Sequence, residues 1–323
     1  METAGSMART PFHVHSAITL VSLALAAVAL AAAPGPQRRN DGTDIFRSGV
    51  DVVQVTATVT DADGRLVADL ERDDFEIFED GHLQTLTHFT RDRVPLSLGV
   101  VLDISQSMSG QRIDDSRLAL DQFLADRLDP ADEVFVIVFN HSPVVEVSWT
   151  LGPRRVRHRL DSIRPWGGTS IYDAMMEALP LFESRANQRA AVVLISDGAD
   201  TGSRADVREV RRQLRRSDAF VYAIAIDAPE TRAINDRVNP SALREMTMES
   251  GGYTEVVHDS PELAPATARI ADELNHQYTL SYTPTRSADG TYRSIRVRVA
   301  SDYRVRNRRG YVADPHLVGD AGR

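Results

Sequence analysis

Cysteine and lysine are both absent from this chain of 323 residues. Without cysteine, the protein has no disulfide, no thiolate nucleophile and no zinc site built on cysteine sulfur. Without lysine, it has neither Schiff-base chemistry nor the lysine of a P-loop, and all 37 of its basic residues are arginine. Packing, hydrogen bonds or an ion with oxygen ligands must therefore stabilise the fold.

The chain also lacks an excess of positive charge, because 46 acidic residues outnumber the 37 arginines and the formal net charge is −9. Binding to phosphate backbones depends on clustered positive charge, so we expect no nucleic-acid partner. The composition, 42% hydrophobic and 26% charged, is that of an ordinary globular protein. At this length, about two domains are expected.

An apolar run covers residues 17–33 and ends in small residues. It follows the pattern of a secretory signal, and Ala29-Leu30-Ala31 matches the A-x-A cleavage pattern. We therefore expect 1–33 to be a signal peptide and 34–49 a linker, with export to the periplasm, the exterior or the cell envelope of a bacterium. An uncleaved membrane anchor is the alternative, because the run is near the lower length limit of a spanning helix.

Residues 50–92 have the pattern of a small antiparallel β module. Val53, Val55, Ala57 and Val59 alternate with polar residues, which predicts a strand with one buried face. Two further strands are predicted at 75–78 and 83–89, around an Asp-Gly pair that favours a hairpin turn. A module of this size buries little core alone, so it requires a packing partner.

From residue 93 to 274 the pattern changes to strands alternating with helices. Continuous apolar runs predict strands buried on both faces at 96–102, 134–139, 191–195 and 220–226. Helical patterns cover 113–128, 153–163, 171–182, 205–217 and 261–274. This order predicts an α/β fold with a doubly wound, mainly parallel sheet, whose ligand site lies at the carboxyl ends of its strands.

Residues 275–314 return to alternation, and three antiparallel strands fit the pattern, followed by a tail at 315–323. The net charge is −8 over residues 41–91 and +5 over residues 286–323. Opposite charges favour packing of the two β segments into one small sandwich beside the α/β domain. The alternative is that each charge marks only a solvated face.

Polar side chains follow the predicted sheet strands in three places. Asp103-Ile104-Ser105-Gln106-Ser107 ends the first strand, a Gly-Gly-Thr-Ser string at 167–170 precedes a helix, and Ser196-Asp197-Gly198 ends another strand. Together these loops would bring five oxygen-bearing side chains to one point. The five are Asp103, Ser105, Ser107, Thr169 and Asp197. Such a set suits Mg²⁺, and Mn²⁺ or Ca²⁺ accepts the same ligand type.

These motifs resemble the metal-ion-dependent adhesion site (MIDAS) of von Willebrand factor type A domains, over about residues 94–274. The flanking segments are similar to those of a bacterial subgroup first noted in acidobacteria. The resemblance implies that Ser105, Ser107 and Thr169 contact the metal directly. It implies that Asp103 and Asp197 act through waters.

Neutral hydroxyl ligands leave most of a cation's charge unneutralised, so a carboxylate from another molecule can complete the shell. We therefore expect an exported protein that binds a partner through the partner's Asp or Glu, without catalysis of its own. A membrane contact is expected only if the leader is not cleaved. Two alternatives remain open: a metal-dependent hydrolase, and a structural envelope component in which the ion only stabilises the loops. The sequence contains no H-E-x-x-H, G-x-S-x-G or P-loop motif.

Other features of the sequence carry weaker predictions about function. The arginine run at 208–216 is expected to form a solvated helix face with i,i+4 ion pairs. Trp166 either borders the ligand face or anchors its loop. From its position between the two predicted domains, the helix at 261–274 is also expected to shift when ligand binds.

Overall fold

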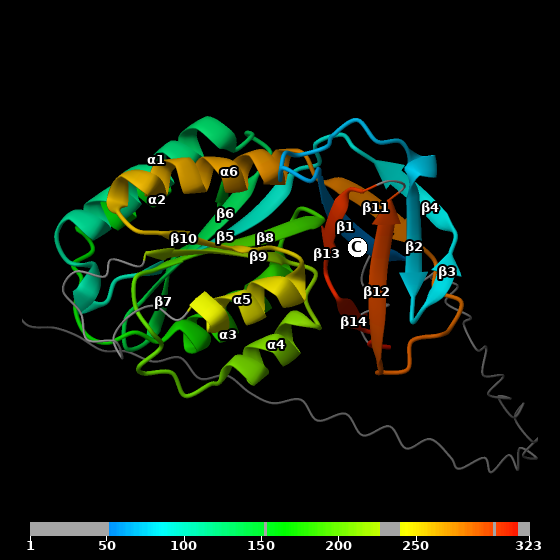
Figure 1. Ribbon diagram of the computed structural model, residues 1–323. Helices are drawn as coiled ribbons and strands as arrows, with labels where there is room; N and C mark the ends of the chain where they lie inside the picture. Colours follow the sequence, from blue (N-terminus) through cyan, green and yellow to red (C-terminus); the bar gives the residue numbers. More distant parts are fainter. Residues whose placement is uncertain (1–51, 152–153, 227–239, 300–301, 316–323) are drawn as a thin grey trace, which may run out of the picture. The chain divides into compact units, whose positions relative to one another are not determined.

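The computed structural model describes residues 52–151, 154–226, 240–299 and 302–315, all within one compact unit, Ser48–Arg323. The predicted signal peptide at 1–33, the linker at 34–49 and nearly all of the tail lie outside the described residues. Within the described ranges, three sheets and the helices around them make up the fold (Figure 1). None of the helices found there is long and apolar enough to cross a membrane.

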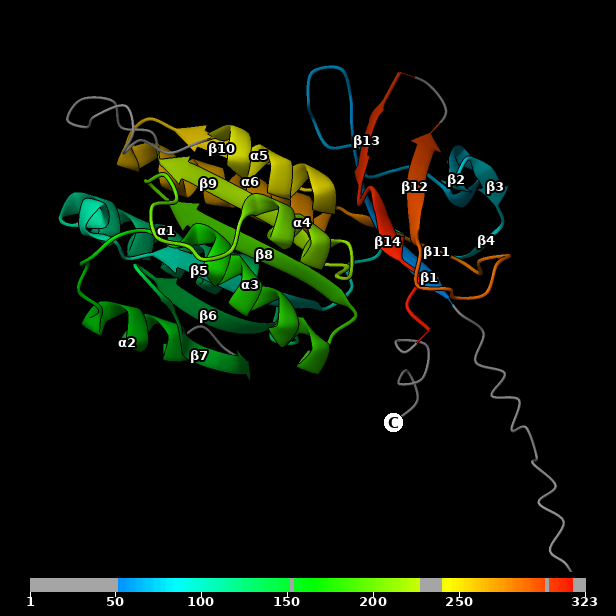
Figure 2. The ribbon, with the colours of Figure 1, turned by 90° about the horizontal axis from the view of Figure 1, so that it is seen from below.

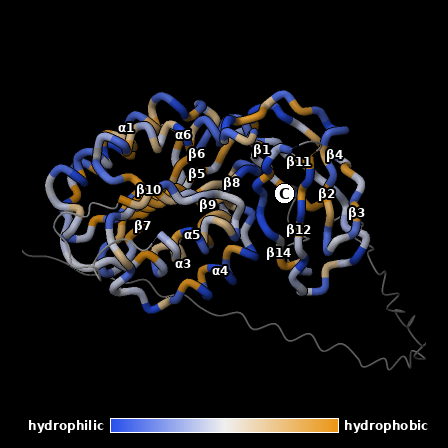
Figure 3. The backbone as a smooth tube through the Cα atoms, viewed as in Figure 1, coloured by the Kyte–Doolittle hydropathy of each residue, from blue (hydrophilic) through white to orange (hydrophobic). Residues whose placement is uncertain are grey.

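The central sheet has six strands in the order β10-β9-β8-β5-β6-β7, all parallel except β7. The strands are β5 (Leu96–Asp103), β6 (Glu133–Phe139), β7 (Pro143–Leu151), β8 (Arg189–Ser196), β9 (Phe220–Ile226) and β10 (Thr254–Val257). Every residue of β5, β6, β8 and β9 is buried, as expected for strands covered on both faces. The predicted α/β class and its four apolar strands are confirmed. Figure 3 shows the hydrophobic colour gathered along these central strands.

Helices cover both faces of this sheet. They are α1 (Gln111–Arg127), α2 (Arg154–Ser162), α3 (Ile171–Leu181), α4 (Val207–Leu214), α5 (Pro240–Ser250) and α6 (Leu263–Asn275). Figures 1 and 2 show α1, α2 and α6 on one face and α3, α4 and α5 on the other. Alternate strand residues supply the two cores: Leu102 packs in the cluster with α1 and α6, and Val101 in the cluster with α3 to α5.

Three elements of this domain were not predicted. β7 is an antiparallel edge strand whose pairing with β6 is irregular, so its burial pattern has no clean alternation. β10 has only four residues and depends on its parallel pairing with β9. α5 begins at a proline, which is suited to the first turn of a helix, and its apolar residues are too few to give a strong pattern.

Beside the α/β domain, two four-stranded antiparallel sheets form a sandwich, in the orders β13-β1-β11-β4 and β14-β12-β2-β3. The strands are β1 (Val53–Thr60), β2 (Phe75–Glu79), β3 (His82–Gln84), β4 (Leu86–Thr90), β11 (Tyr278–Tyr282), β12 (Tyr292–Val299), β13 (Arg304–Asn307) and β14 (Gly310–Val312). Val55 pairs with Leu280, and Ile77 with Val297, so strands from both β segments interleave. Both segments share one hydrophobic core, which confirms the predicted small sandwich.

The expected charge attraction between the two β segments is visible at one end of the sandwich. Glu79 of β2 is buried and lies 3.4 Å from Arg293 of β12, and Arg286 pairs with Asp80. Asp80 and Gly81 both have positive φ, 47° and 82°, as the predicted two-residue hairpin requires.

The prediction of one strand at 83–89 is wrong. The segment divides after Gln84: β3 pairs with β2 in one sheet, and β4 pairs with β11 in the other. A strand that crosses between the sheets of a sandwich changes its partners at the bend, and alternation alone does not reveal this. β14 was also not predicted, because three residues are too few to show a pattern.

The arginine run at 208–216 corrects another prediction. Arg212 is exposed and pairs with Glu209 one turn away, as expected of a solvated face. Arg211 and Arg215, however, bind Glu249 of α5, at 3.0 and 2.9 Å. Glu249 is only 3% exposed, so this part of the run holds two helices together.

Buried polar contacts join the sandwich to the α/β domain. Glu273 of α6 accepts hydrogen bonds from Thr58 of β1 (3.1 Å) and Tyr222 of β9 (2.8 Å), and pairs with Arg306 of β13. The backbones of the two parts also approach closely, because a Cβ added to Gly251, just after α5, would lie 2.5 Å from the backbone carbonyl carbon of Asn307 in β13. The end of α6 is therefore held from both sides.

Candidate metal centre

The order of the central sheet brings two of the predicted site loops together. From β5 the chain continues to β6 on one side, and later to β8 on the other, so the strand order reverses at β5. In such sheets, ligands bind outside the carboxyl ends of the strands at this switch point. Asp103 is the last residue of β5 and Asp197 directly follows β8, whose residues pair with those of β5 up to Leu102 and Ile195.

Hydrogen bonds link four of the five predicted side chains into one cluster. The Asp103 Oδ1 atom accepts the backbone N–H of Ser105 (2.7 Å), which turns the chain immediately after the strand. The hydroxyls of Ser105 and Ser107 are 2.9 Å apart, and Ser107 donates to Asp197 Oδ1 (2.7 Å). Side-chain oxygens from two loops thus converge at one point.

Thr169, the fifth predicted side chain, lies against the loop that carries Asp197. A Cβ added to Gly198 would lie 3.2 Å from Thr169 Oγ1, so the hydroxyl is next to the residue that follows Asp197. The backbone N–H groups of Thr201 and Gly202 both donate to the Thr169 carbonyl oxygen at 2.9 Å. These bonds hold the loop before α3 against the loop after β8.

The cluster carries negative charge in a buried place. Burial raises the pKa of the Asp103 carboxyl to about 7, a hydrogen bond from Ser196 (2.6 Å) opposes this rise, and the charge of Asp197 adds to it. Asp103 and Asp197 are only 0% and 1% exposed. Two desolvated carboxylates this close together create an environment that a bound cation would stabilise.

The donor set fits a hard divalent cation, since it consists of two carboxylates and three hydroxyls. No group of three or more His, Cys, Asp or Glu side chains suited to a metal occurs among the described residues. This agrees with a site in which hydroxyls outnumber carboxylates.

Two residues of the cluster were not predicted. Ser196 donates to Asp103 Oδ2, and its signal was a single polar residue at the end of an apolar strand. Arg112, in the first turn of α1, lies 3.4 Å from Asp197 Oδ2 and donates to the Ser107 carbonyl oxygen (2.9 Å). Nothing in the spacing of the motif pointed to this arginine.

Trp166 lies on an anchored loop, as one of its two interpretations predicts. Its backbone N–H donates to the Ile104 carbonyl oxygen (3.0 Å), and the Gln106 N–H donates to the Gly167 carbonyl oxygen (3.0 Å). These two bonds anchor its loop to the loop after β5. Its side chain is nevertheless 54% exposed, and its ring lies 4.6 Å from that of His141. The indole is therefore exposed on a loop that is anchored to the loop after β5.

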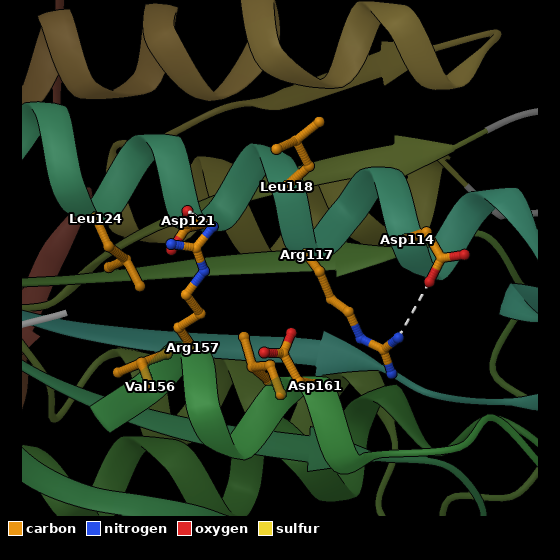
Figure 4. A pocket seen from close by; sticks show the side chains of 9 residues that line it. Asp114, Arg117, Leu118, Asp121, Leu124, Val156, Arg157 and Asp161 are labelled. Carbon is orange, nitrogen blue, oxygen red and sulfur yellow. Dashed lines mark hydrogen bonds and ion pairs between the residues drawn. The ribbon is translucent and has the colours of Figure 1, made fainter. Parts of the chain in front are cut away.

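A groove of about 240 Å³ runs between α1 and α2 (Figure 4). Charged residues of both helices line it, and Arg117 pairs with Asp114 along its wall. None of the five predicted ligands lines the groove. It is a separate feature from the cluster at the strand ends.

Comparisons with known proteins match part of the chain. A family model described as von Willebrand factor type A domain matches residues 98–199. Inter-alpha-trypsin inhibitor heavy chain H4 of Homo sapiens is 25% identical over 183 residues, covering 53% of this chain and 19% of that protein. Heavy chain H2 of Mesocricetus auratus is 25% identical over 179 residues, with 50% and 19% covered. The chain spans about a fifth of the length of these curated relatives.

A solved structure shares the fold at lower sequence identity. Proximal thread matrix protein 1 from the mussel byssus, solved with a zinc-occupied MIDAS motif, is 15% identical, with a TM-score of 0.51. The match covers 61% of this chain and 50% of that chain. At this identity, the likeness concerns the fold alone.

Proposed function

The chain carries a von Willebrand factor type A domain, and we propose that this domain binds a partner protein through a divalent cation. The residues that would hold the cation are Asp103, Ser105, Ser107, Thr169 and Asp197. The observation that carries the proposal is the convergence of these side chains at the switch point of the sheet, with Ser107 bonded to Asp197 across two loops.

The chemistry of the donor set indicates what the partner supplies. Because the three hydroxyls are neutral, the cation would keep charge at its open position to attract a further anionic oxygen, although Asp103 and Asp197 balance it over the site as a whole. The carboxylate of an Asp or Glu on the partner's surface is such a group. We propose Mg²⁺ as the cation, and Mn²⁺ or Ca²⁺ would accept the same oxygens.

We propose binding rather than catalysis because both carboxylates of the cluster already hold hydrogen bonds. Asp103 accepts from the Ser105 N–H and from Ser196, and Asp197 accepts from Ser107. A hydrolase needs a base placed to activate a water molecule. Carboxylates engaged within the cluster are better suited to holding a cation than to accepting a proton from water.

We also propose that the protein works outside the cytoplasm, on the basis of the apolar run at 17–33. Its membership of the bacterial subgroup suggested by its flanking segments stays a prediction. Sequencing the amino terminus of the protein recovered from each cell fraction tests export. A mature chain beginning near residue 34 would support it, and an intact leader in the membrane fraction would favour the anchor.

Selection from a displayed library of random peptides on the immobilised protein tests the binding mode. Peptides bound in Mg²⁺ and released by EDTA are expected to share an Asp or Glu, and changing that residue to Asn or Gln should abolish binding. Selected peptides without an acidic residue, or binding that persists in EDTA, would contradict the proposal.

A matched pair of serine variants extends this test. Ser107→Ala removes a hydroxyl of the cluster, whereas Ser116→Ala on α1 removes a buried hydroxyl that has no hydrogen-bond partner. The first should abolish the Mg²⁺-dependent binding of a selected peptide, and the second should leave it intact. Equal behaviour of the two variants would argue against a role for the cluster.

A further inference from the structure

Arg112 is a basic side chain in contact with the candidate metal centre. It lies in the first turn of α1, five residues after Ser107, and its Nη1 atom makes two contacts. It donates to the Ser107 carbonyl oxygen at 2.9 Å and lies 3.4 Å from Asp197 Oδ2. Its side chain is 24% exposed, whereas that of Asp197 is 1% exposed. The guanidinium thus connects the buried cluster to solvent.

The charges of the site give this arginine a specific consequence. Asp103 and Asp197 together contribute a charge of −2, which a divalent cation would balance. Arg112 then leaves the loaded site with a charge of +1. For the cation alone this arginine is unfavourable, because like charges repel. For an incoming carboxylate it is favourable, because the loaded site attracts a single negative charge.

The geometry of arginine suits this role. A guanidinium has five N–H donors in a planar fork that matches a carboxylate, and both contacts of Arg112 with the cluster use Nη1. Its Nε and Nη2 atoms carry further N–H donors. Hydrogen bonds between a guanidinium and a carboxylate are also stronger than those between neutral groups.

We propose that Arg112 is the second contact of the partner's carboxylate: one carboxylate oxygen completes the shell of the cation, and the other accepts a hydrogen bond from Arg112. This inference rests on the proposed function of the same site. The inference adds selectivity to that function. A neutral amide oxygen can reach the cation, but it has no negative charge for Arg112 to attract. Arg112 would make the site select Asp and Glu over Asn and Gln.

The competing explanation is that Arg112 only positions Asp197 and the loop after β5. The two roles predict opposite effects on cation binding. If Arg112 only positions the cluster, its removal loosens Asp197 and weakens cation binding. If Arg112 acts on the carboxylate, its removal takes a positive charge away from the cation and strengthens cation binding.

The test uses the full chain with Mn²⁺ as the cation and acetate as the carboxylate probe. Electron paramagnetic resonance of free Mn²⁺ measures cation affinity, and relaxation of the acetate protons by bound Mn²⁺ measures acetate affinity. Acetamide serves as the neutral probe. The variants are Arg112→Gln and, as a matched control, Arg127→Gln at the other end of α1, where the side chain is 41% exposed and pairs with Asp272.

We expect Arg112→Gln to bind Mn²⁺ roughly three- to tenfold more tightly and acetate about tenfold more weakly, with acetamide unchanged. Arg127→Gln should match the wild type in all three measurements. Arg112→Lys keeps the charge and loses the fork, so Mn²⁺ affinity should stay unchanged while acetate binds about threefold more weakly. The lysine variant also serves if Arg112→Gln fails to fold.

Several outcomes would overturn the inference. Weaker binding of both Mn²⁺ and acetate by Arg112→Gln would assign Arg112 a positioning role. Acetate affinity equal to that of the wild type, or wild-type protein that binds Mn²⁺ but does not prefer acetate to acetamide, would remove the carboxylate contact and leave the metal site intact. A wild type that binds no Mn²⁺ would overturn the proposed function together with this inference.

Discussion

Replacing Asp103 with Asn separates the functional role of this carboxylate from its structural role. The change preserves the size of the side chain and removes one of the two negative charges of the cluster. Asn Oδ1 can still accept the Ser105 N–H, which lies 2.7 Å from the aspartate oxygen. The Nδ2 group then faces the Ser196 hydroxyl, which must accept instead of donate. The local hydrogen bonds therefore survive with one reversed.

Two effects of opposite sign follow from the burial of this charge. Without a cation, Asp103 is a fully buried carboxylate close to Asp197, so its neutralisation should stabilise the fold by about 1–3 kcal/mol. With Mg²⁺ at a hundred times its dissociation constant, the wild type should gain about 2.7 kcal/mol. The variant should lose this gain because one of the two charges that hold the cation is missing.

Thermal unfolding of the full chain in EDTA and in Mg²⁺ measures both effects. At roughly 2–4 °C per kcal/mol for a unit of this size, the midpoint of the variant in EDTA should exceed that of the wild type by about 2–12 °C. Mg²⁺ should raise the wild-type midpoint by about 5–11 °C and leave the variant unchanged. Asp126→Asn, at an exposed position of α1, is the matched control and should behave as the wild type does.

The reasoning would be refuted in either of two ways. If the Asn variant gained as much from Mg²⁺ as the wild type, Asp103 would not hold the cation. If the variant unfolded well below the wild type in EDTA, the carboxylate would stabilise the fold, and the argument from charge burial would be wrong.

Two further predictions concern the packing of the fold, and urea unfolding measures both. Gly252→Ala should lower the free energy of unfolding by about 3 kcal/mol, because the new Cβ would lie 2.0 Å from the Val221 carbonyl oxygen. Gly64→Ala should lower it by about 1 kcal/mol, because Gly64 has open space around it and only its φ of +81° opposes a side chain. Equal losses for the two variants would contradict this reasoning. Glu249→Gln should lower the free energy of unfolding by about 3 kcal/mol, because it leaves Arg211 and Arg215 without their buried anionic partner. A loss below about 1 kcal/mol would show that these contacts are dispensable.

Much of the α/β domain could be predicted because its strands are buried on both faces. A run such as 220–226 has no polar face, so it indicates a covered strand without knowledge of its neighbours. The helix at 113–128 was equally clear, since Ile113, Leu120 and Phe123 are all buried on one stripe. Elements whose stability comes from pairing, such as β7, β10 and β14, have no comparable signal in their own residues.

The candidate site divides in the same way. Its five predicted side chains lie at the ends of recognisable strands or before a recognisable helix, so the position of each along the chain was predictable. Ser196 and Arg112 were missed because their importance comes from contacts with residues 93 and 85 positions away in the sequence. For example, the approach of Arg112 to Asp197 depends on how α1 leaves the loop after β5.

By itself, the sequence of this protein determined the local patterns: buried strands, amphipathic helices, the hairpin at Asp80-Gly81 and the oxygen-bearing loops at strand ends. These follow from side-chain periodicity and turn chemistry, which act over a few residues. The tertiary structure alone decided the order of the strands, the division of residues 83–89 between two sheets, the burial of Glu249 against two arginines, and the place of Arg112 beside Asp197. Each of these depends on which distant segments pack together, because long-range packing and charge pairing arise only when the whole chain is folded.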